Sequence, residues 1–172
     1  PQASRGRLIR LIDATTVPKA GAADKRGNKL WRIHSAFDLP HERFGHFELT
    51  DEREGETFDR IPVVKGEIRI GDRVYLQPDR IAAVLDQGAD ILVRAGWKGA
   101  RWLDADGEPL DLIAQLRKAS SRGLIDRQIL IARKGGVPLA LRLVAVKKPP
   151  QAAAAARRKA RREAQREGRR IS

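Results

Sequence analysis

Three short segments near the N-terminus limit the folds that this chain can adopt. Residues 8–12 are almost entirely apolar, and residues 30–39 and 46–51 alternate between apolar and polar side chains. Loops that contain Gly, Pro, Asn or Asp separate the three segments. Short apolar or alternating segments with turns between them predict β-strands that pair with their neighbours along the chain. The first third of the molecule is therefore expected to form an antiparallel meander.

A second unit follows, in which a helix joins two strands. Residues 54–60 have a helix-compatible composition, and residues 68–75 predict a fourth strand that ends at or near Asp72. Pro78 then opens an amphipathic segment that ends before Gly88, and these residue types are favoured at the start and the end of a helix. Residues 90–94 have an apolar centre, Ile91-Leu92-Val93, and predict a fifth strand. Because a strand, a helix and a strand in this order favour parallel pairing, we expect an α/β fold with a mixed sheet.

The last part of the chain has a different pattern. Residues 110–116 predict a short amphipathic helix, and residues 124–132 and 137–146 predict a β-hairpin around a Gly-rich turn. After Pro149 and Pro150, an Ala- and Arg-rich stretch predicts one long helix that ends near residue 168. The chain is therefore expected to divide into a core, a β-rich part and a basic helix, at residues 1–97, 98–148 and 149–172.

Positive charge is concentrated at the C-terminal end. The chain has 35 Lys and Arg residues against 22 Asp and Glu residues, a net charge of +13. Residues 147–172 hold ten of the basic residues and two of the acidic ones, a net of +8, which leaves +5 on residues 1–146. Such a helix is either a solvated charged helix or one that binds DNA phosphates with release of counterions. The candidate DNA-binding residues on it are Arg157, Arg158, Arg161 and Arg162.

Composition excludes several classes of protein. Hydrophobic residues make up 41% of the chain, which is enough for a packed core. The absence of cysteine excludes disulfide bonds and zinc sites built on thiolates. No apolar run approaches the roughly 20 residues that cross a bilayer, and no secretory signal pattern is present, so we expect a protein without a membrane partner. The chain also lacks methionine and opens at Pro1, which favours a fragment of a longer protein.

Two aspartates at the ends of predicted strands are the first candidates for chemistry. Asp13 follows the first strand, and Asp72 lies at the end of the fourth. If these strands are neighbours in the sheet, the two carboxylates converge at one edge. Paired carboxylates are hard oxygen ligands suited to Mg²⁺ or Mn²⁺, and such ions can activate a water or hydroxyl for attack on a phosphodiester. The alternative is that each aspartate only caps a turn or a helix.

Four short sequence motifs follow one another along the body of the chain. They are Ile12–Thr15, Trp31–Leu39, Gly71–Tyr75 and Gln87–Arg94. Together they resemble the DDE transposases of the insertion-sequence-four family. The motif around Asp72 is similar to the Asp-Arg-Gly-Tyr signature of that family, with Val74 in place of the glycine. The resemblance covers roughly residues 8–146.

The resemblance implies a fold, an activity and roles for particular residues. The fold would be ribonuclease-H-like, with a β-rich insertion after the fifth strand. Asp13 and Asp72 would be the first two acidic metal ligands of the catalytic DDE triad, with Mg²⁺ or Mn²⁺ as the cofactor. The activity would be DNA strand cleavage and strand transfer at transposon ends, carried out by a dimer of the full-length protein. Its location would be cytoplasmic and nucleoid-associated, in a bacterium. Arg73 and Arg94 would contact DNA phosphates, and a plain surface arginine is the alternative for each.

The third acidic ligand of that family is not found in this sequence. It is a Glu within the pattern Tyr-x-x-Arg-x-x-x-Glu-x-x-x-x-x-x-Lys on a helix, and the single tyrosine, Tyr75, has Pro78 three positions later. Glu163 and Glu167 lie in the basic helix without that context. The chain alone is therefore expected to be catalytically incomplete, cut before its third carboxylate.

Other conspicuous side chains are expected to be structural. His34 lies mid-strand among aromatic residues, which favours packing on the sheet over metal binding. Asp38 is expected to start a turn, and Tyr75 to pack at a strand end. Trp97 and Trp102 flank a Gly-rich corner, where packing is the expected role and contact with a flipped base is the alternative.

Two other functions compete with the transposase interpretation. The chain could be a DNA-binding remnant without catalysis, since the third acid is missing. It could also be a basic RNA-associated protein, which the net charge and the Arg-rich end alone would suggest. The two aspartates in the nearly balanced body of the chain favour the transposase interpretation over both.

Overall fold

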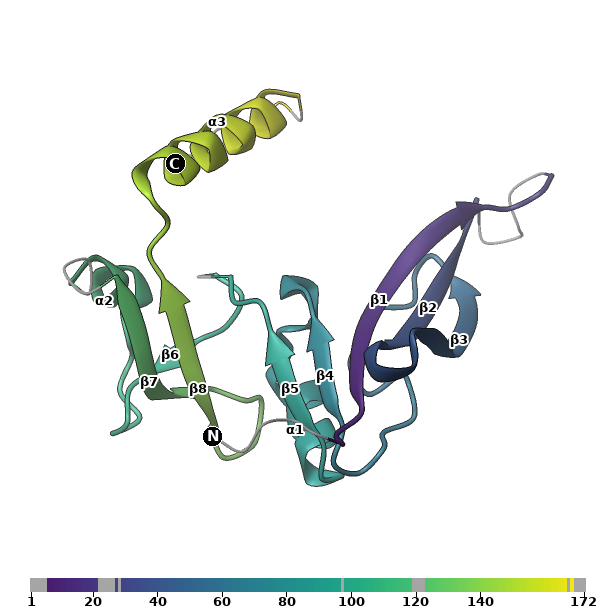
Figure 1. The fold of residues 1–172 in the computed structure, drawn as a ribbon, viewed down its shortest axis with the longest axis horizontal. Helices are drawn as coiled ribbons and strands as arrows, with labels where there is room; N and C mark the ends of the chain where they lie inside the picture. The colour runs from purple at the N-terminus through teal and green to yellow at the C-terminus, as the bar shows by residue number, and fades with distance from the viewer. Residues whose placement is uncertain are drawn as a thin grey trace.

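Two sheets that lie next to each other form the body of the protein (Figure 1). The computed structural model describes residues 6–21, 27, 29–96, 98–118, 123–166 and 168. The larger sheet has the strand order β3-β2-β1-β4-β5, and the smaller one has the order β6-β7-β8. The strands of the larger sheet are β1 (Ile9–Pro18), β2 (Leu30–Asp38), β3 (Arg43–Asp51), β4 (Ile68–Gly71) and β5 (Asp90–Val93). Those of the smaller sheet are β6 (Trp102–Leu103), β7 (Leu124–Ile131) and β8 (Leu139–Val146).

The larger sheet contains both predicted units. Strands β1, β2 and β3 pair antiparallel in sequence order, which confirms the meander. Strand β4 pairs in parallel with β1 on one side and with β5 on the other. Helix α1 (Pro78–Asp86) connects β4 to β5, and Gly88 ends the turn after it with a φ of 80°, a conformation that glycine adopts readily. The predicted βαβ unit and the mixed α/β sheet are thus confirmed.

Two local predictions are wrong. The first strand does not end before Asp13, because β2 continues to pair with β1 as far as Pro18 opposite Leu30. Asp13 therefore lies in the middle of a strand. Residues 54–60 do not form a helix but a series of turns, in which the backbone carbonyl of Phe58 accepts a hydrogen bond from Arg69 of β4.

The two faces of the larger sheet differ in how they are covered. Ile12 and Ala36 lie opposite each other on the inner face and are buried against Phe58 and against Ile81 of α1. On the outer face, neighbouring positions of the same strands are open to solvent. The exposed large apolar side chains there include Leu11, Trp31, Phe44, Phe47, Leu49 and Leu92, at 38–60% exposure. The core of this sheet is therefore one-sided within the described residues.

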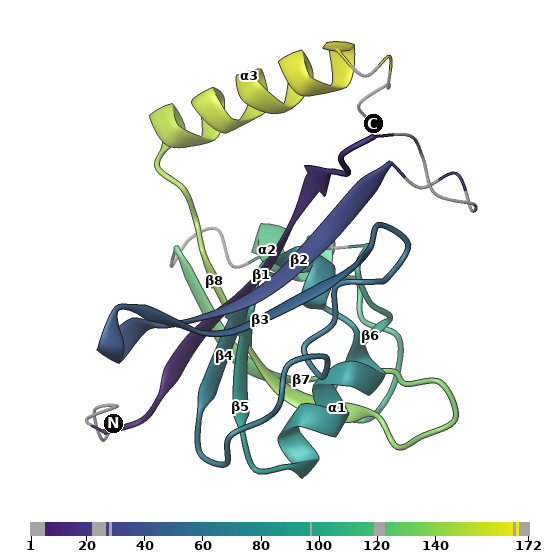
Figure 2. The ribbon, with the colours of Figure 1, turned by 90° about the vertical axis from the view of Figure 1, so that its right-hand side faces the viewer.

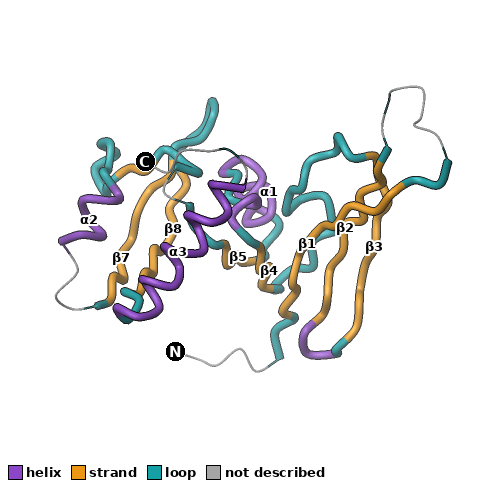
Figure 3. The backbone as a smooth tube through the Cα atoms, turned by 90° about the horizontal axis from the view of Figure 1, so that it is seen from above, coloured by secondary structure: helices purple, strands orange, loops and turns teal. Residues whose placement is uncertain are grey.

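The smaller sheet packs against the end of the larger one. Helix α2 (Leu112–Lys118) lies on it, and one apolar cluster continues from Tyr75 and Leu76 to Trp102 and Leu112. An apolar cavity of about 610 Å³ lies between β5 and this sheet. Figure 3 shows β4 and β5 between the meander and the smaller sheet. The predicted hairpin is confirmed as β7 and β8.

The predicted basic helix is observed as α3 (Pro150–Arg166). It lies apart from both sheets, on the side of the molecule toward which β4 and β5 point (Figures 1 and 2). Its four central arginines, at positions 157, 158, 161 and 162, are all exposed. Among the described helices, none is long and apolar enough to cross a membrane.

Candidate functional site

Asp13 and Asp72 lie near each other because of the register between two parallel strands. Strands β1 and β4 pair with Leu11 opposite Ile70. Asp13 and Asp72 each lie two residues beyond this last pair, Asp13 within β1 and Asp72 directly after β4. The charges of both act on Glu56 and on Tyr75, so the two aspartates lie in the same part of the molecule. The predicted neighbourhood of the first and fourth strands is confirmed, although Asp13 reaches it from mid-strand.

Both carboxylates are exposed and keep oxygens available. Asp72 precedes the 3₁₀ helix Arg73–Tyr75, and its Oδ1 accepts a hydrogen bond of 2.8 Å from the Val74 backbone N–H. The capping role considered from the sequence is thus observed for Asp72, and it uses one carboxylate oxygen. Neither Asp13 nor Asp72 forms an ion pair with any residue that the structure describes. Two unpaired carboxylates side by side form a local negative site that suits a hard divalent cation.

A third carboxylate, that of Glu56, lies close enough to both aspartates for their charges to affect its pKa. Glu56 is half-buried, and Arg32 Nη1 lies 2.9 Å from its Oε1. Burial raises the pKa of Glu56, the Arg32 guanidinium opposes that rise, and the charges of Asp13 and Asp72 add to it. Sequence reasoning missed Glu56 because it lies in a loop and matches no motif. Only the tertiary fold brings Glu56 near the two aspartates.

The charges of these three carboxylates also act on Tyr75, but its side chain is buried and not available to a ligand. It is 1% exposed, and its ring packs on Phe58 with 4.9 Å between ring centroids. Burial raises the pKa of its hydroxyl, and Glu56 and the two aspartates raise it further. The predicted packing role of Tyr75 is confirmed.

The described residues contain no complete metal centre. Across residues 6–166, outside the short gaps, no group of three or more His, Cys, Asp or Glu side chains is placed so that it could hold a metal ion. The acidic pair therefore offers two protein ligands. The remaining positions of an octahedral ion would be filled by water, by DNA phosphate or by further protein groups.

Arg73 and Arg94 lie at the same edge of the sheet as the aspartates. The backbone N–H of Arg94 donates a 3.2 Å hydrogen bond to the carbonyl of Gly71, the residue before Asp72. The side chain of Arg73 passes close to Gly96, since a Cβ added there would meet its Cδ at 4.0 Å. Both arginines are exposed, in positions from which a phosphate near the acidic pair could be reached.

The remaining predicted structural residues behave in different ways. His34 is 2% exposed in β2, and its Nε2 lies 2.9 Å from Thr50 Oγ1; burial first, and then Arg60, lower its pKa. Asp38 precedes a short 3₁₀ helix, as expected for a turn, but it is also buried against Arg10. Trp102 is buried, which confirms packing, and Trp97 lies outside the described residues.

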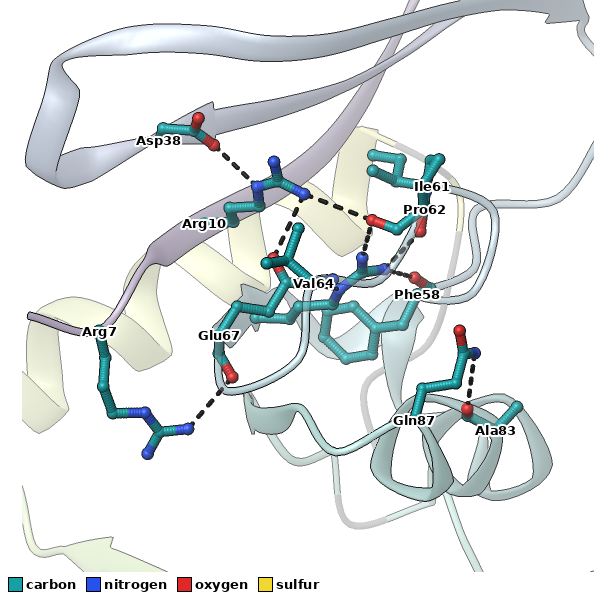
Figure 4. Close-up of polar contacts among 11 residues, drawn as sticks. Arg7, Arg10, Asp38, Phe58, Ile61, Pro62, Val64, Glu67, Ala83 and Gln87 are labelled. Atoms are coloured by element: carbon teal, nitrogen blue, oxygen red, sulfur yellow. Dashed lines mark hydrogen bonds and ion pairs between the residues drawn. The ribbon is translucent and has the colours of Figure 1, made fainter.

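A buried charge cluster beneath the sheet is the largest feature that sequence reasoning missed. Glu67 and Arg69 are both fully buried, with 2.6 Å between Glu67 Oε1 and Arg69 Nε. Arg10 joins them, with its Nη1 3.3 Å from Glu67 Oε2 and its Nε 2.8 Å from Asp38 Oδ1 (Figure 4). Alternation within β4 gives no signal for it, because a charged residue at a strand position normally predicts a solvent-facing side chain.

Sequence comparison relates the chain to proteins of insertion sequences. Over 154 residues it is 36% identical to the transposase of insertion sequence element IS421 from Escherichia coli. The identity is the same to the InsL protein of insertion sequence element IS186A from Escherichia coli strain K12, which is also named as a transposase. No family model and no solved structure matches the chain. The matched stretch is 86% of this chain, and the chain spans about 40% of the length of these curated relatives. The homologues of this chain are therefore transposases of insertion sequences.

Proposed function

We propose that this chain supplies the first two metal ligands of a DNA transposase of the insertion-sequence-four family. The observation that supports the proposal is the parallel pairing of β1 with β4 in a chain whose homologues are transposases, because Asp13 and Asp72 follow the last pair by two residues each and form no ion pair within the described residues. The strand order β3-β2-β1-β4-β5, with a meander followed by parallel strands, is compatible with a ribonuclease-H-like sheet. The β-rich residues 98–148 would be an insertion into that fold.

The proposed chemistry is hydrolysis of a DNA strand followed by strand transfer. Asp13 and Asp72 would hold Mg²⁺ or Mn²⁺, which supplies charge stabilisation and an activated nucleophile for in-line displacement at phosphorus. Arg73 and Arg94 would orient the phosphate beside the pair. The DNA would consist of the insertion-sequence ends and the target, bound in an assembly that contains two copies of the whole protein.

The acidic pair by itself is not expected to complete the reaction. A two-carboxylate site leaves a divalent ion mostly hydrated and loosely placed. We therefore expect this chain to bind Mn²⁺ and DNA without cleaving a supercoiled plasmid that contains insertion-sequence ends. Nicking that depends on Asp13 and Asp72 would contradict the need for a third acid and would leave the metal assignment intact.

Calorimetric titration with Mn²⁺ tests the metal assignment. The variants Asp13→Asn and Asp72→Asn keep size and polarity but remove one negative charge each, so each is expected to weaken Mn²⁺ binding about tenfold or more. Asp86→Asn, at the exposed end of α1, is the matched control and should bind as the parent does. Equal affinities in all four proteins would refute the proposed metal site.

Salt dependence of DNA binding tests the role of α3. Replacing Arg157, Arg158, Arg161 and Arg162 by Ala is expected to reduce the slope of log affinity against log salt by up to roughly 3–4, since each lost phosphate contact removes about 0.9. A control set removes the same charge from exposed positions on the body of the protein, at Arg43, Arg101, Arg117 and Lys134. The two sets should differ clearly if α3 lies along the DNA backbone.

The same measurements separate the competing functions. Normal DNA binding with no specific Mn²⁺ site would favour a non-catalytic DNA-binding protein. A marked preference for structured RNA over insertion-sequence-end DNA at the same salt concentration would favour an RNA-associated protein.

A further inference from the structure

We infer that the crossover segment, residues 56–64, is a positioning device for Asp72, held by Arg69 and acting through the contact of Phe58 with Gly71. This inference rests on the proposed role of Asp72 as a metal ligand. It assigns a role to residues that lie beneath the sheet and touch neither metal nor DNA. Phe58 and Gly71 are positioning residues in this scheme.

Arg69 fixes the crossover segment from inside the sheet. It is 0% exposed, and its guanidinium donates hydrogen bonds to the backbone carbonyls of Phe58, Ile61 and Pro62, with 2.8 Å to Ile61 and 2.6 Å to Pro62. A planar guanidinium with several donors can hold several carbonyls in one fixed arrangement. The segment thus has a defined position although it contains no regular secondary structure.

Glu67 holds Arg69 and the end of the segment together. Its Oε1 accepts from Arg69 Nε at 2.6 Å and from the Val64 backbone N–H at 3.0 Å. Both charged side chains are fully buried, so neither can exchange these partners for water without exposing the interior. The clamp is therefore rigid, and it lies directly beneath the strand that leads to Asp72.

Phe58 transmits the position of this clamp to the end of β4. Its ring is 0% exposed and packs on Tyr75. A Cβ added at Gly71 would lie 2.8 Å from two ring atoms of Phe58 and 2.9 Å from Tyr75 Cδ2. Glycine is required here by close approach, and its φ is not in the left-handed region. The two rings thus press against the backbone of the residue that immediately precedes Asp72.

Strand β5, the neighbour of β4 in the sheet, also holds Gly71 in place. Gly71 pairs with Val93 of β5, and its carbonyl accepts the hydrogen bond from the Arg94 N–H. Asp72 in turn begins the 3₁₀ helix that carries Tyr75 back onto Phe58. Because the backbone before and after Asp72 is in contact with one ring pair, a shift of that pair moves the carboxylate relative to Asp13.

A double-mutant experiment on this chain tests the inference, with Mn²⁺ as the probe. Gly71→Ala adds a methyl group against the rings and is expected to weaken Mn²⁺ binding about tenfold, a loss typical of outer-shell changes. Phe58→Leu removes the ring and is expected to weaken binding by a smaller factor, because the end of β4 loses its support. The combination of the two refills the space and should bind more tightly than Gly71→Ala alone. A merely structural role would give additive losses, so recovery of affinity in the double variant is the decisive readout.

The control variant is Gly55→Ala, at a glycine that the structure shows in open space. It should bind Mn²⁺ as the parent does. All affinities are measured on protein shown by circular dichroism to be folded. If Gly71→Ala does not fold, Phe58→Leu alone decides: unchanged affinity overturns the inference, and weakened affinity supports it. Absence of Mn²⁺ binding in the parent would instead refute the proposed metal site itself.

Discussion

Strand β1 and the segment around β4 carry two groups of charged residues, and the two groups differ in burial and in ion pairing. Arg10 and Arg69 lie opposite each other on the inner face, and with Glu67 they form a buried cluster in which the charges are paired. Three residues further along each strand, Asp13 and Asp72 are exposed and form no ion pair within the described residues. Charged residues of β1 and of the segment around β4 are thus paired and buried at one position and exposed three residues further along.

The difference follows from the cost of burying charge. A buried ion is tolerated only when its partners replace the water that it has lost. The Arg69 guanidinium accordingly donates four hydrogen bonds, and the Glu67 carboxylate accepts two at Oε1 and is ion-paired with Arg10 at Oε2. Burial lowers the pKa of Arg69, and Glu67 opposes that change. The exposed aspartates stay hydrated and therefore have no such desolvation cost. Carboxylates without an ion-pair partner would be unfavourable inside the protein, but at the surface water solvates them.

Removal of Arg69 is expected to have the largest effect on stability. Arg69→Met keeps the volume but leaves the buried Glu67 carboxylate and three backbone carbonyls without their main donor. The free energy of unfolding, measured by urea titration, should fall by about 3–5 kcal/mol. The control Arg73→Met, at an exposed arginine, should stay within about 0.5 kcal/mol of the parent. Similar losses in both variants would remove the contrast between the two groups.

A matched pair of aspartates should show an intermediate difference. Asp38 is 5% exposed and accepts from Arg10 Nε at 2.8 Å, so Asp38→Asn should cost about 2 kcal/mol through loss of a charge-assisted hydrogen bond. Asp13→Asn, on the neighbouring strand, should leave the unfolding free energy within about 0.5 kcal/mol. The same two variants should rank oppositely in Mn²⁺ binding, with the loss confined to Asp13→Asn. A stability loss at Asp13 equal to that at Asp38 would indicate a structural role for both.

The smallest expected effect is a pH dependence from His34, another buried polar residue of the inner face. Burial lowers its pKa below the ordinary value of 6.5, so the unfolded chain takes up a proton more readily than the folded one. The contribution of His34 to stability is therefore retained above pH 6.5 and falls as the pH drops below it. Urea titrations between pH 7.5 and 5 should show this decline, and His34→Gln should lose part of it. An unchanged pH dependence in the variant would assign the decline to other groups.

Local patterns predicted the elements of the larger sheet well. The period-2 alternation of β2 and the apolar run of β5 reflect sheet faces that are buried or partly buried, and Pro78 and Gly88 bound α1 as their conformational preferences require. The basic helix followed from the propensities of Ala and Arg alone. The end of β1 was missed because strand length depends on the partner strand, and β2 extends the pairing beyond Asp13 to Pro18.

The candidate site was accessible to prediction only in part. Both aspartates were identified from their places next to apolar segments, and their convergence followed from the assumption that β1 and β4 are neighbours. Glu56 and Arg69 were not identified, because a loop carboxylate and a charged strand residue have ordinary solvent-exposed alternatives. What sets them apart is burial, which no local pattern reports.

By itself, the amino-acid sequence determined the elements of this protein, the uneven distribution of its charge and the two aspartates on which chemistry would depend. These properties are local, since propensity and periodicity act over a few residues. The tertiary structure alone decided that β1 pairs in parallel with β4, that Arg69 is buried and that Gly71 has no room for a side chain. Each of these depends on which distant segments pack together, because burial and close approach arise only when the chain has folded.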